Sequence, residues 1–322
     1  MRQHKGKLPA YLRTAGSKKS KGSIPSFEES FEQHISKMPV KSKLAKEHIR
    51  SKFEKALIDV AAKYKSLQLE PTKTPETIEV IIDRQRNLTL KYNPLFLNTK
   101  TEEVIDALLL HEACHVATLP NSLIKVPDIG NNDQIMFMAN YVTNYDEYLA
   151  HAFFVEKFKS DKRYESLRKR HIDLFLNFET IIDSMKTLVT VSITRGLLIN
   201  QFKVLEQLHN IAYDALFFYV ADDDSFLKWC RKHGLEELYG FINWLFEDFE
   251  HITNLGLPYE ETRKKLIPSG VLSMSVNPTK LMVEGKIEFA ETTKRLHEDM
   301  MQKGRDTDLV KLWEKRRQLY ER

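Results

Sequence analysis

The stretch TEEVIDALLLHEACHVAT, residues 101–118, decides the fold that we expect for this chain. Apolar side chains recur in it at three- and four-residue intervals, which is typical of a helix with a broad buried face. Thr99 or Thr101 can cap the helix, because a threonine hydroxyl accepts a hydrogen bond from the first free backbone N–H groups. We therefore expect a buried, central helix that ends near residue 118.

The same helix contains the pattern His-Glu-x-x-His, as His111-Glu112-Ala113-Cys114-His115. Residues four apart lie on one helix face, so the imidazoles of His111 and His115 can bind one metal ion. Glu112 can reach a metal-bound water and accept its proton, which indicates peptide hydrolysis at a single Zn²⁺ ion. The alternative is an exposed helix with two solvated histidines, which the apolar neighbours disfavour. We expect Cys114 to be a small buried thiol on the face turned away from the metal.

A catalytic zinc usually has three protein ligands, so the chain must offer one more donor. The stretch NYDEYLAHAF, residues 144–153, presents Asp146, Glu147 and His151 on a second expected helix. We favour Glu147, because it shares a face with Ala150, whose small side chain lets two helices approach closely. Asp146 and His151 stay open as alternatives, and an ordinary solvated charge is the other interpretation of Glu147. If Glu147 is the ligand, His151 is expected to contact a ligand rather than the ion.

The sequence pattern changes on either side of the central helix. Two β-type runs precede it, at residues 77–82 and 88–92, and residues 119–139 are rich in Pro, Gly and Asn, which favours a loop. Helices are expected over residues 40–67, 140–188, 197–219, 225–231, 235–253 and 287–320, with the acidic run 222–224 as a cap. Tyr141, Tyr145 and Tyr148 are candidates to bind an oxyanion near the site, although core packing is expected for at least two of them.

Composition limits the classes of protein that this chain can represent. Its 322 residues are 42% hydrophobic, enough for one large core or two smaller ones, and two cysteines cannot form a disulfide framework. No run approaches the roughly 20 apolar residues of a membrane span, and no secretory signal is evident, so we expect a cytoplasmic protein without membrane contact.

The first 22 residues carry seven Lys and Arg side chains and no acidic residue. Because the net charge of the whole chain is only +4, the remainder is mildly acidic, and any affinity for polyanions is expected to lie in this leader. Two interpretations stay open: a solvated, disordered leader, or a weak contact with nucleic acid or another acidic partner.

Residues 111–115 resemble the active-site helix of the zincin metallopeptidases, and the pattern Glu-x-x-Ala-x-x-Phe at residues 147–153 is similar to the third-ligand helix of their gluzincin branch. The ImmA/IrrE-type cytoplasmic peptidases are the nearest comparison, and the resemblance covers residues 77–158. It implies zinc held by His111, His115 and Glu147, with Glu112 as the general base.

The chain also departs from these families. Many gluzincins have an aspartate four residues after the ligand glutamate, where this chain has His151, so the support of the ligands differs. Thr118 and Asn121 stand where the metzincin extension requires glycine and histidine, which excludes that branch.

These observations predict an α+β fold: a zincin-like core with a small β-sheet and an active-site helix, followed by a mostly α-helical C-terminal region. The expected organisation is a basic leader over residues 1–22, a metallopeptidase domain over 23–160 and a helical domain of unknown role over 161–322. The expected function is a zinc metallopeptidase with a protein or peptide substrate, in its narrowest form one that cleaves a single regulator. The alternative is a helical interaction or nucleic-acid-associated protein with a structural or inactive metal site.

Overall fold

The computed structural model describes residues 41–74, 78–118, 132–197, 201–232, 234–274 and 276–289, and the positions 311, 314, 315 and 318. The chain divides into two units, Met1–Leu44 and Ala45–Arg322. The leader expected over residues 1–22 lies outside the described residues, as does most of the helix expected over 287–320. The described part is mostly helical with a three-stranded sheet, which is an α+β fold.

The sheet has the order β1-β3-β2, with β1 at Ser66–Pro71, β2 at Ile78–Ile82 and β3 at Asn87–Tyr92. The central strand β3 pairs in parallel with β1 and antiparallel with β2, so that Leu90 lies between Leu69 and Val80. The two strands expected from the sequence are confirmed, apart from residue 77, which lies outside the described residues.

Strand β1 corrects the helix expected over residues 40–67. Helix α2 spans Lys41–Asp59, and Ala61 follows it with a φ of 54°, in the left-handed region, which ends the helical path. The chain then enters β1, where Leu67 and Leu69 alternate with polar residues and pair with β3. Pairing with a strand 21 residues later in the chain therefore overrides a helical pattern that was only local.

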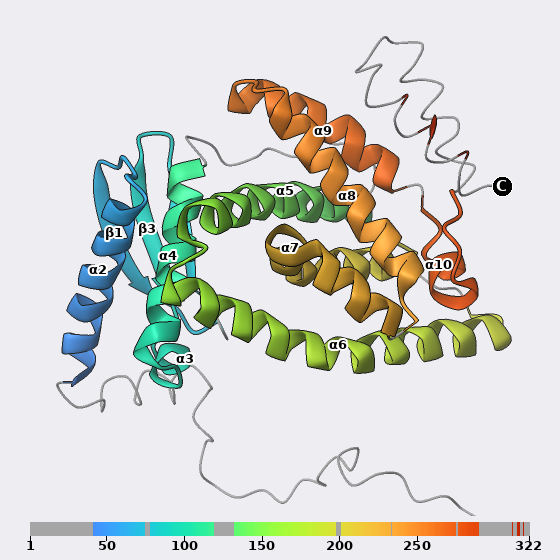
Figure 1. The fold of residues 1–322 in the computed structure, drawn as a ribbon, viewed down its shortest axis with the longest axis horizontal. Coiled ribbons are helices and arrows are strands. Elements are labelled where there is room, and N and C mark those ends of the chain that lie inside the picture. The colour runs from blue at the N-terminus through green and yellow to red at the C-terminus, as the bar shows by residue number, and fades with distance from the viewer. Residues whose placement is uncertain are drawn as a thin grey trace, which may run out of the picture. The chain divides into compact units, whose positions relative to one another are not determined.

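Helices α3 and α4 follow the sheet. The Asn93 side chain accepts hydrogen bonds from the backbone N–H groups of Leu95 and Phe96, which starts the short helix α3 at Pro94–Asn98. Helix α4 spans Glu102–Thr118, as expected, and packs against β2, α5 and α6. Figure 1 shows α4 beside the sheet, with α5 and α6 leading away from it.

The remaining helices are α5 at Asn132–Phe158, α6 at Lys162–Thr194, α7 at Gln201–Lys232, α8 at Glu236–Asn254, α9 at Tyr259–Ser273 and α10 at Pro278–Glu284. Four expectations were wrong. Residues 132–139 form the start of α5 rather than part of a loop, and Asp161 caps α6, so the single helix expected over 140–188 is two helices. The acidic run at 222–224 lies inside α7 instead of capping a helix. Residues 287–289 are not helical. Helices α9 and α10 were not expected, because Pro268 lies inside the first and the second is short.

Two apolar cores share helices α5 and α6. The sheet-side core includes Phe53, Leu90, Leu109, Ala150 and Phe154, and the helical core includes Tyr141, Tyr145, Leu208, Phe241 and Phe249. Helix α5 thus passes from one core into the other between Tyr145 and Ala150. The expected domain boundary near residue 160 stays a prediction. Within the described residues, none of the helices is both long and apolar enough to span a membrane.

Candidate metal centre

Helix α4 buries both histidines of the His-Glu-x-x-His motif. The side chains of His111 and His115 lie one turn apart, with ring centroids 4.9 Å from each other, and each residue is only 8% exposed. Leu109, Leu110 and Val116 are also buried, because the apolar face of α4 packs in the sheet-side core. The alternative of two solvated histidines is therefore wrong.

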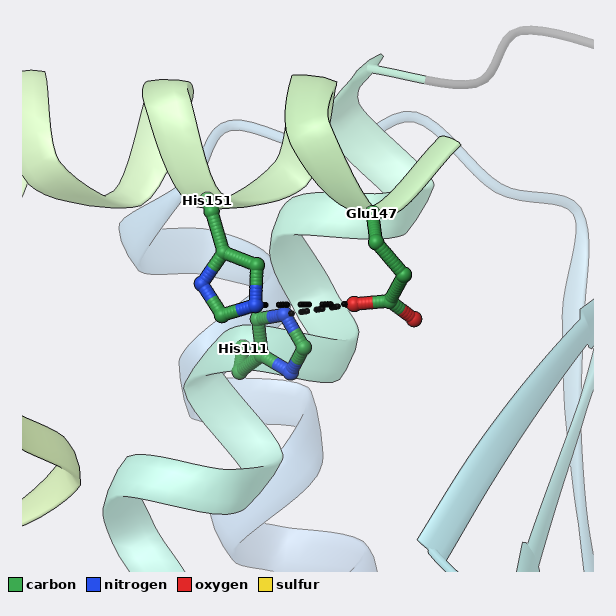
Figure 2. A group of neighbouring side chains, drawn as sticks. All are labelled: His111, Glu147 and His151. Carbon is green, nitrogen blue, oxygen red and sulfur yellow. Dashed lines mark ion pairs between the residues drawn. The ribbon is translucent and has the colours of Figure 1, made fainter. Parts of the chain in front are cut away.

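Helix α5 brings Glu147 and His151 to the same place, and Figure 2 shows both side chains directed toward His111. One oxygen of the carboxylate, Glu147 Oε2, lies 3.4 Å from His111 Nε2 and 3.6 Å from His151 Nε2. The other, Oε1, lies 3.2 Å from His115 Nε2. Glu147 and His151 are 8% and 2% exposed, so Glu147 is not the solvated helix charge that the sequence left open.

Two overlapping groups of side chains have metal-ligand atoms that all lie within 4.8 Å of one another: His111 with Glu147 and His151, and His111 with Glu112 and His115. The expected set of His111, His115 and Glu147 is not one of these groups among the described residues; its two histidines contact different oxygens of Glu147, and the set stays a prediction. Asp146 belongs to neither group among the described residues, whereas His151, the other open alternative, is a full member of the first.

The short distances from α4 to α5 depend on a small residue at the helix contact. Ala150 is fully buried in the sheet-side core, one residue before His151, and Phe154 lies one turn further along the same face. A larger side chain at position 150 would separate the helices and draw Glu147 away from both histidines. The small residue was expected from the sequence to allow a close approach of two helices, and the structure buries it in the sheet-side core, to which both α4 and α5 contribute.

The charges in the cluster influence one another strongly. Burial alone would raise the pKa of the Glu147 carboxyl, but His115 and His111 outweigh it and hold this pKa well below the ordinary value. Burial alone would lower the pKa of His115, yet the Glu147 carboxylate raises it to about 9. Glu147 is therefore an anion at neutral pH, in the ionised form that a metal ligand requires.

The side chain of Glu112 extends from α4 to β2, an edge strand of the sheet. Its Oε2 accepts a hydrogen bond of 3.0 Å from the backbone N–H of Val80 in β2, and its Oε1 lies 3.9 Å from His111 Nδ1. Burial raises the pKa of Glu112, while His115 and His111 oppose the rise. The contact with Val80 was not foreseen, because nothing in the local sequence pairs an edge strand with a helix side chain.

The remaining candidates lie outside the cluster. Cys114 is a fully buried free thiol, as expected, and burial raises its pKa, so it stays protonated. Tyr141 hydrogen-bonds Ser269 on α9, Tyr145 hydrogen-bonds Thr253 Oγ1 at 3.2 Å, and Tyr148 packs against Phe246 and Phe249. The tyrosines thus contribute to the helical core, as expected for at least two of them.

Comparison with known proteins gives no match: no family model, no curated protein and no solved structure is similar to this chain. Buried His111, Glu147 and His151 can hold a metal ion, and His115 and Glu112 adjoin them.

Proposed function

We propose that this chain is a cytoplasmic zinc-dependent metallopeptidase of the zincin type, related to the gluzincin branch and to the ImmA/IrrE-type peptidases, which hydrolyses peptide bonds in a protein or peptide substrate. The observation that carries the proposal is the buried contact of Glu147 with both histidines of the His-Glu-x-x-His motif, with Glu112 held beside them. A helix with this motif that packs directly against a β-strand also agrees with a zincin-like core.

The donor set fits a zinc ion. Two imidazoles and one carboxylate are the ligands of many catalytic zinc sites, and they leave one position open. Grouping three imidazoles and a carboxylate at 8% exposure or less is costly unless they are paired or bind a cation. His111, His115 and Glu147 would hold the ion, which when bound lowers the pKa of a water molecule to about 7 and polarises the substrate carbonyl.

Glu112 would carry the proton in this reaction. Its Oε2 is fixed by the Val80 N–H, which leaves Oε1 directed toward the side of His111. Because burial raises the pKa of this carboxyl, the group is a stronger base than an exposed glutamate. Glu112 Oε1 takes a proton from the attacking water and delivers it to the nitrogen of the leaving amine.

The test is cleavage of a mixed peptide library by purified, zinc-loaded protein, with products identified by mass spectrometry. The matched control is Glu112→Gln, which keeps the size of the side chain and removes the base. We expect a loss of about 100- to 10,000-fold in the cleavage rate with an unchanged zinc content, because Glu112 moves a proton and does not hold the ion. Equal cleavage by both proteins, or none by the wild type on any peptide or protein tested, would refute the proposal.

A second candidate is a helical interaction protein in which the same cluster is a structural metal site. The observation that favours it is His151, which adds a donor where an open catalytic site has none. In that case zinc removal would lower stability, and Glu112→Gln would change no measurable property except stability.

A further inference from the structure

The two helices of the cluster present equivalent pairs of donors. On α4 the pair is His111 and His115, and on α5 it is Glu147 and His151, each with the four-residue spacing that aligns side chains on one helix face. The two helices pack directly against each other. The resemblance to zincins involves only three of these four donors and gives His151 no role.

The distances within the cluster fit ligands around an ion better than they fit hydrogen bonds. The three histidine Nε2 atoms lie 3.2, 3.4 and 3.6 Å from the nearest Glu147 oxygen. A hydrogen bond between a charged imidazole and a carboxylate is shorter, about 2.7–2.9 Å. Ligand atoms placed tetrahedrally about 2.0–2.1 Å from a zinc ion lie about 3.3 Å from one another. The separations from Glu147 Oε2 to the Nε2 atoms of His111 and His151 are therefore close to the edge of a coordination shell, and His115 lies at a similar distance from the other oxygen, Oε1.

His151 and His111 have similar positions relative to the Glu147 carboxylate. Its ring stacks on that of His111 with centroids 4.4 Å apart and an angle of 29° between the planes. Both Nε2 atoms are directed to the same oxygen, Glu147 Oε2, as Figure 2 shows. His151 is also the most deeply buried of the four donors, at 2% exposure. One ligand atom each from His111, Glu147 and His151 lies within 4.8 Å of the others, so His151 is placed to share an ion with both residues.

We infer that His151 is a fourth protein ligand, so that the resting metal centre has three imidazoles and one carboxylate. The inference deepens the proposed function and rests on its metal site, though not on peptidase activity. Four protein ligands fill a tetrahedral zinc site, so water and substrate enter only if the shell expands to five positions or if His151 leaves. The protein would then bind zinc tightly and cleave generic peptides slowly.

The test counts imidazoles around the ion directly, by X-ray absorption at the zinc edge of the purified full-length protein. We expect three imidazoles per zinc in the wild type and two in His151→Gln. The matched control is His48→Gln, because His48 is an exposed histidine on α2 that contacts Glu102, outside the cluster. That variant should keep three. Two imidazoles in the wild type, or an unchanged count in His151→Gln, would overturn the inference.

Zinc affinity provides a second readout. Removal of a residue that only orients a ligand lowers metal affinity about 10- to 100-fold. We expect His151→Gln to exceed that range in competition with a chromophoric chelator and His48→Gln to leave the affinity unchanged. A loss of about 100-fold or less in His151→Gln would count against ligation, because a residue that only orients a ligand explains it. The wild-type imidazole count decides the question even if the variant does not fold.

The outcomes separate this inference from the proposed function. Three imidazoles in a protein that cleaves nothing would leave the four-ligand centre standing and remove the peptidase. Two imidazoles per zinc in a protein that cleaves peptides would support the peptidase and overturn the four-ligand centre. Failure of the wild type to bind zinc at all would overturn both.

Discussion

Replacing Val80 with proline removes the backbone N–H that donates to Glu112 Oε2 at 3.0 Å. The ladder with β3 survives this change. In an antiparallel pair successive residues direct their N–H groups alternately toward and away from the partner strand, and Val80 directs its own toward Glu112. Proline is tolerated in a strand only where its missing N–H faces outward, and β2 is an edge strand.

The expected loss follows from the position of the base, because the Val80 N–H is the hydrogen-bond donor that fixes Glu112 Oε2 and thereby aims Oε1. Misplacement of a catalytic group by about 1 Å can lower a rate about 100-fold. We therefore expect kcat/KM for peptide cleavage to fall about 10- to 100-fold in Val80→Pro. The N–H also lowers the pKa of Glu112, opposing the effect of burial, so the acidic limb of the pH–rate profile should move to higher pH. Zinc content should not change, because Glu112 is not one of the proposed ligands.

Two control variants separate the hydrogen bond from other effects of proline. Ile78→Pro removes the backbone N–H two residues earlier in β2, at a position where the N–H also points away from β3. Val80→Ala shortens the side chain but keeps the N–H. Both should retain most of the activity and the wild-type acidic limb. If Ile78→Pro loses as much activity as Val80→Pro, the contact with Glu112 has no special role and the reasoning fails.

Three further predictions concern proton release, packing and helix capping. The Glu147 carboxylate outweighs burial and raises the pKa of His115 to about 9, so His115 must release a proton when it binds zinc. The affinity for zinc should therefore rise about tenfold per pH unit up to about pH 9. Titration calorimetry in two buffers of different ionisation enthalpy should detect the released proton. Gly270→Ala should destabilise the protein by about 1–3 kcal/mol in urea unfolding, although alanine usually favours a helix, because its Cβ would lie 2.8 Å from Cδ1 of the buried Tyr141 ring and 2.7 Å from Met138 Sδ. Asp161→Ala should cost about 1 kcal/mol through loss of the α6 cap. The hydrogen bond from Arg163 lowers the pKa of Asp161 in the folded protein. The difference in unfolding free energy between the wild type and Asp161→Ala should therefore be present at neutral pH and disappear as the pH falls below about 4.

Local patterns were sufficient to predict α4 and to select the side chains that the structure brings together as a candidate metal site. The apolar spacing of residues 104–116 and the motif at 111–115 depend on neighbours along one helix, and both are as expected. Strand β1 was missed because its stability comes from pairing with β3, about 20 residues away. The continuous helix α7 was missed because the acidic run at 222–224, a usual cap, lies inside it.

The sequence predicted candidate donors but not their geometry. Glu147 and His151 lie on one face of any helix, so their common direction was foreseeable from spacing alone. The packing of α5 on α4 determines that Glu147 Oε2 contacts His111 and that Oε1 contacts His115. This packing cannot be deduced from spacing along one helix. The contact between Val80 and Glu112 likewise requires the sheet to lie beside the helix, which no spacing within either segment encodes.

The helical region takes part in the site through α5. Near its start, Tyr141 hydrogen-bonds Ser269 on α9, whose hydroxyl also hydrogen-bonds the fully buried Asp248 on α8, while Ala150 and Phe154 near its end pack in the sheet-side core. Buried hydrogen bonds fix direction and register in a way that apolar contacts alone do not. The segment with Glu147 lies between these two anchors, so its distance from α4 is set from both sides. The candidate metal centre therefore depends on the helices beyond residue 160 to hold its two donors on α5, Glu147 and His151, in place.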